Sequence, residues 1–131
     1  VFASLLFALL LLSPAVSSIR SDICYWEGTA PFCKFPHDTC PEGYTEIHRS
    51  ISTYTDFADF GWSCHGVWHT GEKILCCKDW AVLADPKKNC GLEKEMPRGQ
   101  CPKGKLFLLN EDRWLILKDP FCCNHGTILN N

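Results

Sequence analysis

The side chains best suited to do chemistry stand close together in one short stretch of the chain. Cys64, His65 and His69 could bind a metal ion. Ser63 and Asp59 could join His65 in a nucleophilic triad. The two histidines are four positions apart, a spacing that unites two ligands on a helix, whereas the surrounding hairpin-like pattern favours a strand. Because nearness in a loop is not triad geometry, we expect no catalytic residue, no metal and no cofactor.

A second candidate is the stretch "DPFCCNHG", in which His125 follows the cysteine doublet at Cys122. Secreted phospholipases also have a histidine after a doublet, but they require His followed directly by Asp, and a glycine-rich calcium loop. In this chain Gly126 takes the place of the aspartate, and no such loop occurs. The doublet at Cys76 has no histidine after it. We therefore interpret both doublets as parts of a disulfide frame.

Residues 1–18 have the pattern of a secretory signal peptide. An apolar run over residues 1–12 is followed by helix-breaking Pro14 and by small residues that suit cleavage after Ser17 or Ser18. The run is shorter than the about 20 residues that a membrane-spanning helix needs. We expect a secreted, extracellular mature chain with no stable membrane insertion. A retained membrane anchor is the alternative.

Ten cysteines follow the predicted cleavage site, an even number at a density typical of small secreted proteins stabilised by disulfides. If they form five bridges worth about 2–4 kcal/mol each, the bridges rival the net stability of a small domain, about 5–15 kcal/mol. The sequence leaves the pairing open. The ten are Cys24, Cys33, Cys40, Cys64, Cys76, Cys77, Cys90, Cys101, Cys122 and Cys123.

One order of residues occurs twice: a cysteine, then Cys-Pro-x-Gly, then strand-like runs, then a cysteine doublet. We predict two related modules, residues 19–79 with six cysteines and residues 90–131 with four, joined by a linker over residues 80–89. The expected fold is small, disulfide-rich and mostly β, with two hairpins or short sheets and little helix outside the signal peptide. The matched cysteines are Cys33, Cys40, Cys76 and Cys77 in the first module and Cys90, Cys101, Cys122 and Cys123 in the second.

Cys24 and Cys64 are left over in this comparison, so we expect them to pair with each other. Neighbouring residues on a strand point to opposite faces, so each doublet can anchor two separate bridges, one on each side. A bond between the two neighbours themselves would be strained.

Turn residues mark the ends of the predicted strands. In each Cys-Pro-x-Gly step the proline suits position i+1 of a β-turn and the glycine suits position i+3. The runs "LFLL" and "WLIL" predict a hairpin over residues 106–117, with "NEDR" as its polar tip. "CHGVWHTGEKILCC" predicts a hairpin over residues 64–77, with Thr70 and Gly71 near its tip.

The segment over residues 51–63 is a long loop in the first module without a counterpart in the second. Loops of this kind in stapled domains often hold the recognition surface, and exposed aromatic rings beside acids suit a sugar, a peptide or a basic protein. The alternative is that the rings fold back over a core that two thin sheets cannot close. The candidate binding residues are Tyr54, Asp56, Phe57, Asp59, Phe60 and Trp62.

Composition gives no support for binding to nucleic acid or to anionic lipid. The formal net charge is −2, and the basic residues form no stripe. A cationic antimicrobial face is also disfavoured. The sequence contains no Asn-x-Ser/Thr acceptor for N-glycosylation. We expect no nucleic-acid partner.

"GTAPFC" at residues 28–33, together with Trp26, the Cys-Pro-x-Gly step at Cys40 and the doublet at Cys76, resembles segments of cysteine-rich extracellular proteins found chiefly in nematodes. The resemblance covers the first module only. It implies a secreted disulfide module with no established activity and no catalytic residue. The chain departs from that pattern in "KFPHDT" and in the aromatic insertion.

These patterns together predict a secreted binding protein whose partner is an extracellular protein or a glycan, with loop 51–63 as the recognition surface. The alternatives are a small secreted hydrolase, a structural component of an extracellular matrix or cuticle, and a host-defence effector.

Overall fold

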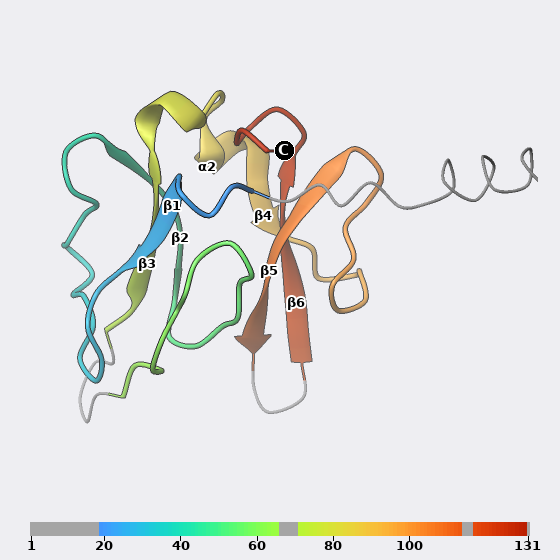
Figure 1. Ribbon diagram of the computed structural model, residues 1–131. Helices are drawn as coiled ribbons and strands as arrows, with labels where there is room; N and C mark the ends of the chain where they lie inside the picture. Colours follow the sequence, from blue (N-terminus) through green and yellow to red (C-terminus); the bar gives the residue numbers. More distant parts are fainter. Residues whose placement is uncertain (1–18, 66–70, 114–116, 131) are drawn as a thin grey trace, which may run out of the picture.

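The computed structural model describes residues 19–65, 71–113 and 117–130, so the predicted signal peptide lies outside the described residues. In these ranges the chain forms two three-stranded antiparallel sheets, with strand orders β1-β3-β2 and β4-β6-β5 (Figure 1). This architecture confirms the predicted small, disulfide-rich, mostly-β fold. The strands are β1 (Cys24–Glu27), β2 (Tyr44–Ser50), β3 (Lys73–Lys78), β4 (Cys90–Leu92), β5 (Lys105–Arg113) and β6 (Leu117–Asn124).

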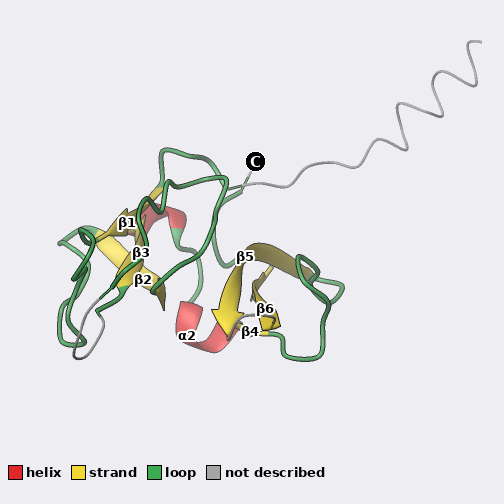
Figure 2. Cartoon of the chain, turned by 90° about the horizontal axis from the view of Figure 1, so that it is seen from below, coloured by secondary structure: helices red, strands yellow, loops and turns green. Residues whose placement is uncertain are grey.

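Two short helical segments lie in the predicted linker region, the 3-10 helix η1 (Asp79–Ala81) and α2 (Pro86–Asn89). Asp85 caps α2, because its carboxylate accepts a hydrogen bond from the Lys87 backbone amide at 3.0 Å. Helix α2 contacts β2, β4 and β6, so it bridges the two sheets (Figure 2). No helix in the described ranges is long and apolar enough to cross a membrane.

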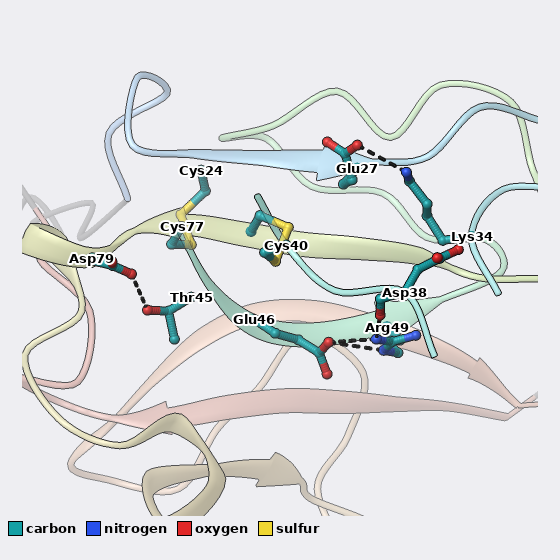
Figure 3. Close-up of a disulfide and its surroundings, with 11 residues drawn as sticks. Cys24, Glu27, Lys34, Asp38, Cys40, Thr45, Glu46, Arg49, Cys77 and Asp79 are labelled. Atoms are coloured by element: carbon teal, nitrogen blue, oxygen red, sulfur yellow. Dashed lines mark hydrogen bonds and ion pairs between the residues drawn. A yellow bond between two sulfur atoms is a disulfide. The ribbon is translucent and has the colours of Figure 1, made fainter. Parts of the chain in front are cut away.

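Each cysteine doublet lies on the central strand of its sheet and anchors two bridges, as predicted. Cys77 of β3 is bonded to Cys24, directly opposite on β1, and Cys76 is bonded to Cys40 before β2 (Figure 3). The second sheet has the same arrangement on β6. There the bridges are Cys90–Cys123 and Cys101–Cys122.

The predicted Cys24–Cys64 bridge is wrong. Cys24 faces Cys77 across the β1–β3 ladder, so the strand pairing itself decides its partner. Cys64 lies after the long loop and is bonded to Cys33 instead. By position in its sheet, Cys24 therefore corresponds to Cys90. The Cys33–Cys64 bridge has no counterpart in the second sheet. That the two modules are related stays a prediction, as do their boundaries.

The turns in the two Cys-Pro-x-Gly steps start one residue later than predicted, at the proline instead of the cysteine. The Tyr44 amide donates to the Pro41 carbonyl at 3.1 Å, and the same contact recurs between Lys105 and Pro102 at 3.1 Å. The proline is thus at position i and the glycine at i+2, with φ of 91° at Gly43 and 88° at Gly104. Positive φ at i+2 is the requirement of a type II turn, which is why glycine stands there.

One of the two predicted hairpins is present in the structure, and the other is not. Strands β5 and β6 form the predicted hairpin, but its tip is not "NEDR", because Asn110 to Arg113 continue the ladder with β6. The tip prediction is therefore wrong. The hairpin over residues 64–77 is also wrong, since β1 and β2 occupy both edges of β3. Residues 66–70 lie outside the described residues.

Both sheets bury side chains in one shared core. The β2–β3 ladder has a register shift between Glu46 and His48, and the β5–β6 ladder has one between Phe107 and Leu109. The extra residues, Ile47 and Leu108, are buried in the common cluster. That cluster also contains Trp26, Leu75, Leu109, Phe121 and Ile128.

Candidate functional site

The aromatic loop over residues 51–63 divides into a buried part and an exposed part. Phe57 and Phe60 are each 5 % exposed and belong to the core. The Phe60 ring meets Trp26 edge-on, with 4.8 Å between ring centroids, and the Trp26 indole donates to the Thr55 hydroxyl at 3.1 Å. These two phenylalanines are therefore core side chains, and Phe57 also lines one of the two cavities described below.

Tyr54 and Trp62 are the exposed aromatic side chains of the loop, at 83 % and 86 %. Trp62 lines a cavity of about 500 Å³. Asp56 and Asp59 are exposed as well, but they line a different cavity of about 390 Å³. The structure thus does not bring the six predicted side chains together at one site.

The larger cavity, here called the Trp62 groove, has a size within the range of about 300–1,000 Å³ typical of small-ligand sites. Two segments and one strand residue form it. They are Gly28–Pro31 from the loop after β1, Gly61–Ser63 with His65 from the end of the aromatic loop, and Lys73 from β3.

Covalent and hydrogen bonds hold these two segments together. The Cys33–Cys64 disulfide joins them directly. The Cys33 amide donates to the Thr29 carbonyl at 2.9 Å, which closes the first segment into a turn, and the His65 amide donates to the Pro31 carbonyl at 2.7 Å. The groove is therefore pre-formed, so a ligand would not have to order these segments.

Gly71, which precedes β3, lies against the backbone that directly follows the first segment. A Cβ atom at this position would lie 2.1 Å from the Phe32 carbonyl oxygen and 2.5 Å from that of Lys34. Such distances exclude every side chain, so only glycine lets the backbone approach so closely. Lys34 and Glu72 then pair as a short antiparallel bridge, with hydrogen bonds of 2.9 and 3.0 Å.

Lys73 brings a cation into the groove from the buried strand β3. Lys73 is only 5 % exposed, and its ammonium donates a hydrogen bond to the Phe60 carbonyl. The ammonium also lies 4.7 Å from the centroid of the Phe60 ring. Desolvation lowers the pKa of Lys73, and the charge of Asp59 acts in the opposite direction.

The residues weighed for catalysis or metal binding are not joined in the described structure. Ser63 Oγ lies 2.8 Å from Ser52 Oγ, and Asp59 accepts a hydrogen bond from the Gly61 amide at 3.0 Å. Neither is hydrogen-bonded to His65 within the described ranges. The described residues hold no metal-binding group of three or more His, Cys, Asp or Glu side chains, and His69 lies outside them. All ten cysteines are in disulfides.

Sequence reasoning found Trp62 but missed Lys73 and Gly28–Pro31 as neighbours in the groove. Lys73 stands before a run of buried strand residues, where a lysine is usually an edge residue pointing to solvent. The sequence signal pointed elsewhere, because it paired Cys64 with Cys24. Only the observed Cys33–Cys64 bridge brings the segment before Cys33 beside the aromatic loop.

No protein-family model, no curated protein and no solved structure matches the chain. The resemblance seen at residues 28–33 therefore stays a prediction. The fold itself defines a small disulfide-stabilised protein of extracellular type, since disulfides at this density form and persist in oxidising compartments.

Proposed function

We propose that the protein is a secreted binding protein and that the Trp62 groove holds its extracellular ligand. The observation that carries the proposal is an 86 % exposed tryptophan at the rim of a concave, pre-formed cavity. A large indole left in water costs free energy unless a partner covers it, and tryptophan is enriched where partners bind. The disulfide that holds the groove is the one without a counterpart in the second sheet.

Secretion is part of the same proposal, and Ile19 supports it. This residue directly follows the predicted cleavage site, is 5 % exposed and pairs with Asn130. A chain cut after Ser18 would keep every described residue of the core. Expression in a eukaryotic secretory host tests this: mass spectrometry of the medium should find a mature chain starting at Ser18 or Ile19, with five disulfides. Retention in the membrane fraction would contradict it.

The binding function is tested with an array of extracellular glycans and purified matrix proteins. Wild type, Trp62→Ala and Tyr54→Ala should be compared on every probe. Tyr54 is the matched control, because it is an equally exposed aromatic of the same loop that does not line the groove. We expect a bound probe whose affinity falls at least about tenfold in Trp62→Ala and is unchanged in Tyr54→Ala. Equal binding by both variants would contradict the proposal.

A further inference from the structure

Two lysines pass beside the groove, and among the described residues Lys34 has a counter-ion whereas Lys73 has none. A Cβ atom on Gly28 would lie 3.3 Å from the Cγ atoms of both Lys34 and Lys73, so the two side chains flank this glycine. The Lys34 ammonium is paired with the Glu27 carboxylate at 3.3 Å (Figure 3). Within the described residues, no carboxylate lies within ion-pair distance of the Lys73 ammonium.

The environment of Lys73 is therefore incomplete. An ammonium has three donor hydrogens, and the hydrogen bond found for Lys73 goes to the Phe60 carbonyl. Asp59 is the acid whose charge raises the pKa of Lys73, but its carboxylate accepts a hydrogen bond from the Gly61 amide instead. A buried cation without an anion is costly. Since Lys73 lines the groove, an anionic group of a ligand in the groove would supply the counter-ion that the described residues do not provide.

Gly61 leaves room for such a group. A Cβ atom at this position would stand 3.3 Å from the Lys73 ammonium nitrogen, and the φ of 74° also favours glycine. Gly61 therefore places no side chain against the ammonium on this side, and Trp62 is the next residue in the chain.

We propose that the ligand of the Trp62 groove is a carboxylate-bearing sugar, a uronate residue of an extracellular glycan, with its carboxylate on Lys73 and its ring face on Trp62. This inference rests on the proposed binding function. The exposed indole offers a flat apolar face, and hydroxyl and imidazole groups of Thr29, Ser63 and His65 border the same groove. A few polar groups around an apolar platform, with one cation, match an acidic sugar ring.

A peptide fits the groove less well. Extended peptides are recognised largely through main-chain hydrogen bonds to a free edge. Three backbone amides in or beside the groove segments are already used: Cys33 donates to Thr29, Cys64 to Ile51 and His65 to Pro31, at 2.7–2.9 Å. Pro31 itself has no amide hydrogen. With these donors engaged, the side chains of Trp62 and Lys73 are the main recognition groups, which favours a sugar.

The test is a calorimetric titration of the mature chain with defined probes. The probes are glucuronate, galacturonate and mannuronate tetrasaccharides, the same tetrasaccharides with their carboxyl groups reduced to alcohols, and a peptide with a free C-terminal carboxylate. We expect binding of at least one uronate probe and an affinity at least about tenfold lower for its reduced form. The change is made on the ligand, so the fold of the protein is not at risk.

Two variants complete the experiment. Lys73→Met removes the charge at similar side-chain length and should abolish the difference between the uronate and its reduced form. Lys34→Met is the matched control, since Lys34 is already neutralised by Glu27. If Lys73→Met does not fold, the two ligand forms on wild type still decide the matter.

The outcomes separate the two proposals. Equal binding of the reduced sugar, or binding of the peptide alone, overturns the uronate inference but leaves a groove ligand in place if Trp62→Ala abolishes that binding. Binding that is insensitive to both Trp62→Ala and Lys73→Met overturns both proposals. A lack of binding by every uronate probe overturns the uronate inference, while the array comparison of Trp62→Ala with Tyr54→Ala decides the binding function separately.

Discussion

His48 Nε2 lies 2.8 Å from Oε2 of Glu111, and this contact joins β2 of one sheet to β5 of the other. The His48 ring also stacks on Phe121, with 4.3 Å between centroids. The other oxygen of Glu111 accepts from the Ser50 hydroxyl at 3.1 Å, and Ser50 is fully buried. The two sheets are thus connected by polar contacts as well as by their shared core.

Glu111→Ala should lower the free energy of unfolding by about 1–3 kcal/mol, because it leaves polar groups on β2 without their partner between the sheets. Guanidinium denaturation of the disulfide-intact chain measures the change. Asp22→Ala is the control: it breaks the Arg20–Asp22 ion pair, whose side chains are exposed, and should leave stability unchanged. Equal effects of the two variants would contradict the inter-sheet role.

Cys33→Ala/Cys64→Ala should cost about 2–4 kcal/mol of stability and change amide chemical shifts only around the Trp62 groove. Cys40→Ala/Cys76→Ala is the matched control, since the sequence separations are 31 and 36 residues. The control should cost a similar amount but perturb β3 and its neighbours. Heteronuclear NMR distinguishes the two patterns. Shift changes throughout the first sheet in the first variant would contradict a local role for Cys33–Cys64.

Gly71→Ala should destabilise the protein by about 1–3 kcal/mol, because the new methyl group would overlap the Phe32 and Lys34 carbonyl oxygens. Gly91→Ala in β4 is the control, where a Cβ would meet nothing within 4 Å. Thermal unfolding of both variants tests the difference. An unchanged melting temperature for Gly71→Ala would show that the loop after β1 can move away from β3 at little cost.

The lowered pKa of Lys73 predicts a specific pH dependence of stability. Between this lowered pKa and the ordinary value of 10.5, the unfolded chain binds more protons at this site than the folded protein does. The contribution of Lys73 to the free energy of unfolding should therefore rise with pH across that window. Below the window Lys73 is charged in both states, so the full cost of burying its charge lowers the stability. The charged groups beside Lys73 are Asp59 and Lys34, and His65 lines the same groove.

Denaturation at a series of pH values, with Lys73→Met as reference, measures this contribution. The difference between the two proteins should narrow as the pH passes through the Lys73 pKa. A bound carboxylate favours the ammonium, so uronate binding should raise the pKa of Lys73, and affinity should fall at high pH. NMR titration of the Lys73 Cε signal follows both effects. An unshifted signal in the complex would place the carboxylate elsewhere.

The sequence was sufficient for the mostly-β fold class and for the role of the doublets. Cys76 and Cys77 end an apolar run, and alternation along a strand sends their side chains to opposite faces, so two bridges from one doublet follow from local geometry. The partner of each cysteine did not follow, because β1 and β2 lie on opposite edges of β3 and their order is a tertiary property.

The candidate site was predictable only in part, for a similar reason. Composition marks loop 51–63 as aromatic, but residue type cannot tell the buried Phe60 from the exposed Trp62, since burial depends on what the loop covers. Lys73 is harder still. Lys73 is a groove residue because its ammonium lies beside Phe60 and Gly61, and only the folded chain brings these residues together.

The second sheet closes with the same strand order and the same doublet bridges but has no third disulfide. In the first sheet, the segments joined by Cys33–Cys64 can therefore be exchanged without touching the bonds that hold β3 between its neighbours, provided that Phe57 and Phe60 stay in the core. For protein engineering, we expect the first sheet to act as a scaffold on which residues 28–31 and 61–63 can be varied while Cys33–Cys64 and Lys73 are kept.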